Sequence, residues 1–303
     1  MKAPMPPVMT YIQKVEAAHS IFRSVLGGAT PDTVFEERTV TISKDGKRLY
    51  EHSGNGHVLA EAVLGMDFPR EAGPIALDHY TSLAGLKAIA ASAQLRLHPV
   101  TKRLHEDEFA TFAREHDLQG YFDDDGRGEK VLEELAKDLF YISLARPGNP
   151  NEPDLWSVFA NDGRGVRLRL RVTPKAPADL RRMGYQTGSP TALKRINDAL
   201  LAQEGLIYTP WTISRICAFY LPIGYREEHE VRLMVKRHVG GPDYTIKGGR
   251  WDVWPIALAA SGTTTGDEWC EIELIEVTAG AHCTLAAVQN ALADTIFSAV
   301  TIS

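Results

Sequence analysis

The sequence has little cysteine and lacks the patterns that mark several common protein classes. Its three cysteines, Cys217, Cys270 and Cys283, are odd in number and widely spaced, and they form no CxxC pair. Neither a disulfide framework nor a zinc site is therefore indicated. Because this usage fits a reducing compartment, we expect a cytoplasmic protein.

Long apolar runs and excess positive charge are also missing. No uninterrupted apolar stretch is long enough to span a bilayer, and the stretch "MKAPMPPVMT" contains no apolar core of a secretion signal. The net charge of -6 argues against non-specific binding to nucleic acid or to an anionic membrane. The motifs GxGxxG, P-loop, HExxH and GxSxG do not occur, so none of them assigns a chemistry.

The 303 residues, 44% hydrophobic and 24% charged, have the composition of a globular protein with a sizeable core. Apolar spacing predicts a helix over 10–26, and "RTVTISKDGKRLYE" predicts a hairpin with a Lys-Asp-Gly-Lys turn. The turn-rich stretch "MDFPREAGP" then suggests a boundary. We expect an N-terminal helix and hairpin accessory segment over 1–70 and a main domain over 71–303.

The main domain shows strands separated by helices and irregular turns, which predicts an α+β fold. Strands are expected over 75–78, 139–145, 166–172, 230–237 and 271–280. Helices are expected after a cap at Thr81 or Ser82, and over 153–162, 190–204 and 284–297.

Two carboxylates in "EEHEVRLMV" form one candidate site. On a strand, Glu228, Glu230 and Arg232 would share the face opposite to the core. Such a pair would suit a cation or a sugar hydroxyl, and the alternative is an edge strand with a solvated face.

His79 and Tyr80 follow a short apolar strand and form a second candidate. His79 offers a hydrogen-bond donor and an acceptor for sugar hydroxyls, and Tyr80 offers a flat face for a heterocycle. The alternative is a packing or capping pair. In "GRGVRLRLRV", Arg167, Arg169 and Arg171 would share one strand face near Arg164 and would either contact phosphates or face solvent.

Five blocks in fixed order carry a resemblance that covers residues 75 to about 280. They are "LDHYTSLAGLKAIAASAQLRL", "LHEDEF", "FYISLA", "LWSVFANDGRGVRLRL" and "YREEHEVRL". Together they resemble a bacterial family of unassigned function with HYTS, LWxxxA and ExExR blocks. That arrangement in turn resembles the ADP-ribosyltransferase fold, a split antiparallel β-sheet core flanked by helices.

The resemblance implies NAD as co-substrate, no metal, and a role for each matched residue. The catalytic residues would be Glu230, on the 2′-hydroxyl of the nicotinamide ribose, and Glu228, on the acceptor side. The NAD-binding residues would be His79, Tyr80, Thr81, Tyr141, Ser143 and Trp156.

The expected function is transfer of ADP-ribose to a macromolecular acceptor, either protein or nucleic acid. Such an enzyme would act as a toxin or an antiphage defence effector, with a cognate immunity or antitoxin protein as a further partner. Two alternatives stay open: an NAD glycohydrolase, and a non-catalytic nucleotide-binding or regulatory module on the same fold.

Overall fold

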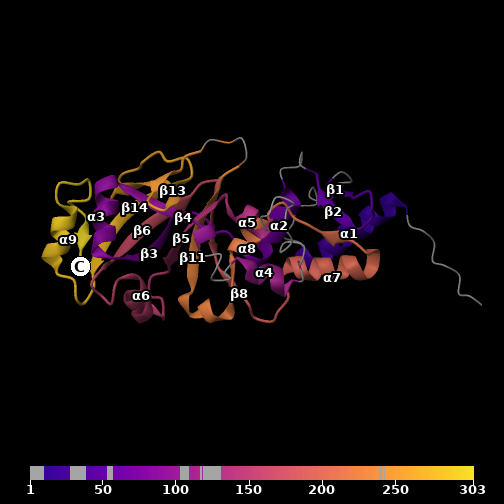
Figure 1. Cartoon of the computed structure of the whole chain (residues 1–303), viewed down its shortest axis with the longest axis horizontal. Coiled ribbons are helices and arrows are strands. Elements are labelled where there is room, and N and C mark those ends of the chain that lie inside the picture. Colours follow the sequence, from indigo (N-terminus) through magenta and orange to yellow (C-terminus); the bar gives the residue numbers. More distant parts are fainter. Residues whose placement is uncertain are drawn as a thin grey trace, which may run out of the picture. The chain divides into compact units, whose positions relative to one another are not determined.

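The computed structural model describes residues 10–27, 39–52, 57–102, 109–116, 118, 131–238, 241 and 243–303. The chain is a mixed α+β protein that divides into two compact units, both drawn in Figure 1. The first unit joins Met1–Pro69 to Thr187–Ile216, and the second joins Arg70–Gln186 to Cys217–Ser303. This differs from the expected division, because residues 187–216 group with the N-terminal segment. Most of the acidic block "LHEDEF", residues 104–108, lies outside the described residues.

The first unit is built on the predicted helix and hairpin. Helix α1 begins after Thr10, whose side chain forms a capping box with Gln13, and it packs against α7. Strand β9, which comes from residues 187–216, pairs in parallel with β2, the second strand of the hairpin. This pairing explains why residues 187–216 belong to the first unit. The elements of this unit are α1 (Tyr11–Leu26), β1 (Val40–Ile42), β2 (Arg48–Glu51), α2 (Val58–Asp67), α7 (Ala192–Glu204) and β9 (Ile207–Tyr208).

The second unit contains a large mixed sheet with the strand order β12-β13-β14-β6-β3-β5-β11-β7. Its strands are β3 (Ile75–Thr81), β4 (Gln94–Pro99), β5 (Leu139–Ala145), β6 (Val166–Pro174), β7 (Ala178–Arg182), β11 (Glu230–Lys236), β12 (Ile246–Gly248), β13 (Trp251–Ala260), β14 (Cys270–Ala279) and β15 (Thr301–Ile302). Strand β14 runs parallel to both β13 and β15, so the sheet is mixed and not purely antiparallel as expected. Strand β4 pairs with both β13 and β5, which closes a circuit of paired strands through β14, β6 and β3.

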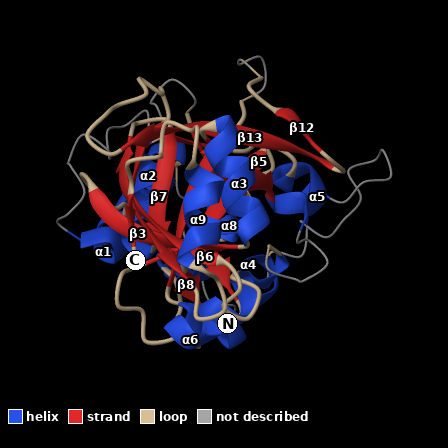
Figure 2. Cartoon of the chain, turned by 90° about the vertical axis from the view of Figure 1, so that its left-hand side faces the viewer, coloured by secondary structure: helices blue, strands red, loops and turns tan. Residues whose placement is uncertain are grey.

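The second unit also contains short helices. They are α3 (Leu83–Ser92), α4 (Ala110–Glu115), α5 (Val131–Ala136), α6 (Glu152–Phe159), η6 (Ile223–Glu228) and α9 (Leu285–Leu292). Helix α8 (Ile213–Ala218) crosses the boundary between the units, and β8 (Gly184–Tyr185) pairs with β10 (Tyr220–Leu221). The Ser82 hydroxyl caps α3 by accepting a bond from the Gly85 N–H, and α3 packs against α9 (Figure 2).

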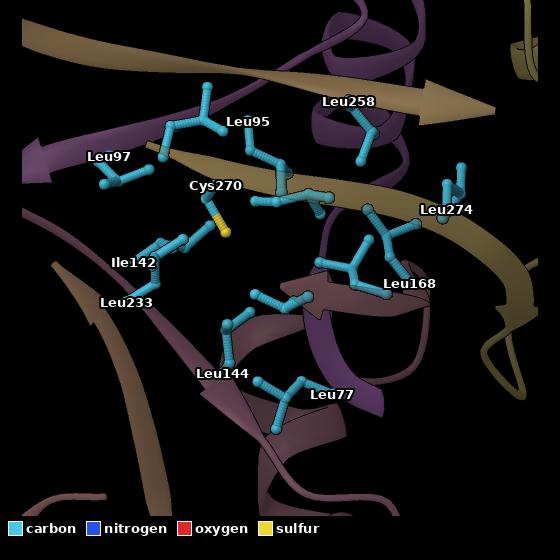
Figure 3. Close-up of a cluster of buried hydrophobic side chains, with 14 of the residues drawn as sticks. Leu77, Leu95, Leu97, Ile142, Leu144, Leu168, Leu233, Leu258, Cys270 and Leu274 are labelled. Atoms are coloured by element: carbon cyan, nitrogen blue, oxygen red, sulfur yellow. The ribbon is translucent and has the colours of Figure 1, made fainter. Parts of the chain in front are cut away.

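The core of the second unit is made by alternate residues of its strands. Leu77 of β3, Leu144 of β5, Leu168 of β6 and Leu233 of β11 belong to the cluster shown in Figure 3. Successive strand side chains point to opposite faces. Burial of this apolar set therefore fixes which polar residues of the same strands lie on the other face.

Candidate functional site

The candidate site lies where β3 and β5 cease to pair. Their pairing is confined to Asp78 opposite Ala145, and a cavity of about 220 Å³ is lined by residues of both strands and of the segment that leads into β11. Six of the eight predicted residues line it: His79, Tyr80, Tyr141, Ser143, Glu228 and Glu230. Side chains from three separate parts of the sequence therefore meet in one place.

His79 is held by the backbone of β5. Its Nδ1 lies 3.2 Å from the carbonyl oxygen of Ser143. Because a carbonyl oxygen only accepts, Nδ1 carries the proton of this bond. Burial lowers the pKa of His79, an effect that the bond to Ser143 partly offsets. The neutral ring then leaves Nε2 as an acceptor, which suits a ligand hydroxyl or N–H group.

Glu230 is a buried carboxylate with fixed partners. Its Oε1 accepts a 2.6 Å bond from the Ser143 hydroxyl and a 2.8 Å bond from Nε of Arg232, and its Oε2 lies 3.2 Å from a second Arg232 nitrogen. The side chains of Glu230 and Arg232 are only 5% and 3% exposed. Ser143 thus positions His79 through its carbonyl group and Glu230 through its hydroxyl group.

Tyr141 and Tyr185 complete the surroundings of Glu230. The guanidinium carbon of Arg232 lies 4.1 Å from the centroid of the Tyr141 ring, which is within cation–π range. The hydroxyl of Tyr185 accepts a 3.0 Å bond from the backbone N–H of Glu230. Burial raises the pKa of Tyr185, and the nearby carboxylates add to this effect, so its phenol stays protonated.

Glu228 lines the cavity without belonging to the strand of Glu230. It ends the 3₁₀ helix η6, and His229 then adopts a left-handed backbone with φ of 46°. The expected i, i+2 arrangement of the two carboxylates on one strand is therefore wrong. The Glu228 carbonyl instead accepts a 2.8 Å bond from Asn149. The edge-strand alternative is also wrong, because β11 pairs with β5 on one side and β7 on the other.

Two predicted residues lie outside this cavity. Trp156 lines a second cavity on α6, and its ring packs edge-on against Tyr80 at 5.2 Å between centroids. Thr81 ends β3 beside α3, where its Oγ1 faces the backbone of Gly85. Tyr80 is largely buried, and burial raises its pKa to about 12, with Glu152 and Asp78 as further causes.

Sequence reasoning missed three contributors to the site. His98 and Lys102 line the cavity from β4 and the residues just after it, a strand that was not predicted. Arg232 was placed beside Glu230 only as part of a strand face. Its i, i+2 spacing from Glu230 was the available signal for the ion pair, since such residues share one face of a strand.

The arginines of β6 do not form an open basic surface. Arg169 donates bonds of 2.9 and 3.1 Å to Asp78, and Arg171 donates one of 2.6 Å to Glu273. Arg167 donates a 2.8 Å bond to Glu152. Asp78 and Glu273 lie beside the arginines because β3 and β14 flank β6, whereas Glu152 comes from helix α6. The expected phosphate-binding face is therefore largely neutralised by ion pairs.

Within the described ranges, no group of three or more His, Cys, Asp or Glu residues is arranged to hold a metal ion. Of the helices that the structure describes, none combines the length and apolarity needed to cross a membrane. Comparisons with family models, with curated proteins and with solved structures gave no significant match to this chain.

Proposed function

We propose that the protein is an NAD-dependent ADP-ribosyltransferase that modifies a macromolecular acceptor in the cytoplasm. The observation that carries the proposal is the double role of Ser143, which holds His79 by its carbonyl group and Glu230 by its hydroxyl group at one cavity. A neutral imidazole acceptor and an oriented carboxylate are the groups that bind ribose hydroxyls and stabilise positive charge on a sugar ring.

The roles of the residues follow from their chemistry. NAD supplies a glycosidic C1′–N bond whose electron pair departs with nicotinamide, while positive charge develops on the ribose. Glu230 would stabilise that charge, more strongly in a buried site than in water. The Tyr141 ring would form the wall for nicotinamide, and Glu228 would accept the proton that the acceptor nucleophile loses on attacking C1′.

The size of the cavity limits what it would enclose. Its volume of about 220 Å³ lies below the roughly 300–1,000 Å³ of sites for drug-sized ligands. We therefore assign to it the nicotinamide ribose portion of NAD, and not the whole dinucleotide.

A second candidate is a nucleotide-binding or regulatory module without turnover. The observation that favours it is the pairing of Glu230, since Arg232 and Ser143 already occupy its carboxylate. A carboxylate with this pairing is also what a structural ion pair requires. A third candidate, NAD hydrolysis, differs from transfer only in using water as the acceptor.

One experiment separates the three candidates. Purified protein is incubated with NAD labelled in the adenylate part, with and without lysate as a source of acceptors. Nicotinamide release with label on protein or nucleic acid supports transfer, and release without label supports hydrolysis. Binding of NAD without release supports the module. If NAD is neither bound nor cleaved, the proposal is refuted.

Variants make this assay specific to the cavity. Glu230→Gln tests the carboxylate, and Glu134→Gln is the matched control, because Glu134 of α5 forms an exposed ion pair with Lys137. Release that is unchanged in both variants would show that Glu230 takes no part in it.

A further inference from the structure

The ion pair of Glu230 and Arg232 has its two ends in different places relative to the cavity. Glu230 and Tyr141 line the cavity, whereas Arg232 is not among the lining residues and lies against the Tyr141 ring at 4.1 Å. One end of the pair therefore presents negative charge to the ligand space, and the other places positive charge against the aromatic wall.

This arrangement is fixed by further contacts. Nη1 of Arg232 donates a 2.6 Å bond to the carbonyl oxygen of Ala218, and the side chain is only 3% exposed. Arg181, which lies opposite Arg232 on β7, has Asp179 as its own partner at 2.9 Å. Because a guanidinium stays protonated in proteins, the positive charge behind Tyr141 is permanent.

We propose that the Glu230–Arg232 pair polarises the cavity so that it favours a neutral aromatic ring at Tyr141 and positive charge at Glu230. The electrons of the Tyr141 ring already attract Arg232, so a cationic ring at the same wall is repelled by the guanidinium while a neutral ring is not. Arg232 acts through Tyr141 and Glu230, and is thus a positioning residue.

This inference rests on the proposed function and deepens it. Before cleavage of NAD, the positive charge is on the pyridinium ring. After the C1′–N bond breaks, the electron pair stays with the ring nitrogen, the released nicotinamide is neutral, and the charge is on the ribose. The polarity of the pair favours this redistribution, because its positive end lies at Tyr141 and its negative end at Glu230.

The test compares binding of two probes that differ in ring charge, nicotinamide and the 1-methylnicotinamide cation, by ligand-observed NMR. The wild type should bind the neutral ring more tightly. Arg232→Met should shift the ratio of the two dissociation constants toward the cation by roughly tenfold, the scale of one screened charge repulsion. Arg232→Lys keeps the positive charge and should keep the wild-type preference. Arg171→Met is the control: Arg171 is half-exposed and pairs with Glu273, so its loss should leave the preference unchanged.

Melting curves establish that each variant is folded before its ratio is interpreted. If Arg232→Met does not fold, Glu230→Gln tests the inference instead. Loss of the negative charge of Glu230 should shift the ratio of the two dissociation constants further toward the neutral ring. The inference is overturned if the wild type binds the cation more tightly, if neither charge substitution changes the ratio of the dissociation constants, or if neither ring binds. Nicotinamide release from NAD by the wild type is measured separately, so failure of the proposed function is distinguished from failure of the polarised cavity.

Discussion

Replacement of Glu230 by glutamine tests both the stability and the chemistry assigned to the site. The variant keeps a similar shape but leaves the buried guanidinium of Arg232 without its carboxylate. Breaking one partner of a buried ion pair costs roughly 3–5 kcal/mol. At about 2–4 °C per kcal/mol for a unit of this size, the melting temperature should fall by roughly 6–20 °C.

The same variant should lose turnover beyond its loss of stability. Removal of one electrostatic stabiliser typically lowers the rate by about 10²–10³-fold. NAD affinity should change far less, since under the proposed function the charge of Glu230 would act mainly in the transition state. Nicotinamide release is measured at a temperature where melting curves show that the variant is folded.

The control for both measurements is Glu134→Gln. Its ion pair with Lys137 is more than 40% exposed on both sides, so its loss should cost at most about 1 kcal/mol and leave release unchanged. A Glu230→Gln protein that melts with the wild type would refute the buried-pair argument. Wild-type release by a folded variant would remove Glu230 from the mechanism.

Three other predictions concern His79, Ser143 and Gly165. Burial lowers the pKa of His79 below its ordinary 6.5, so the unfolded chain takes up a proton before the folded one as pH falls. The stability of the protein should therefore decrease below about pH 6.5. Melting curves at a series of pH values should show a weaker decrease for His79→Gln than for the wild type. Ser143→Ala removes a hydrogen bond to a charged group, worth roughly 1.5–3 kcal/mol, so nicotinamide release should drop about ten- to hundredfold, and an unchanged rate would contradict the positioning role. Gly165→Ala would place a methyl group 2.2 Å from the carbonyl oxygen of Thr81 and should destabilise the fold by roughly 1–3 kcal/mol in urea unfolding, whereas Gly224→Ala, with open space around it, should not.

Local sequence patterns were sufficient for many of the elements. The aromatic and β-branched content of "LFYISLA" predicted β5 over Leu139–Ala145 as observed, and the alternation in "VRLRLRV" predicted β6. Alternation marks a strand such as β6 because burial of one strand face imposes a period of two on the side chains. Strand β13 was missed, although its ten residues Trp251–Ala260 make it as long as β14. Its residues around Pro255 carry little alternation, and proline weakens a strand pattern.

The placement of the charges was decided only by the tertiary structure. The sequence showed arginines on one face of β6, but their partners Asp78 and Glu273 come from β3 and β14, and strand order is not encoded in local periodicity. In the same way, residue types and block order indicated His79, Ser143 and Glu230 as candidates. These three side chains meet at one cavity only because pairing between β3 and β5 ends there and β11 lies beside β5. The same strand arrangement places Arg232 against the Tyr141 ring that lines the cavity.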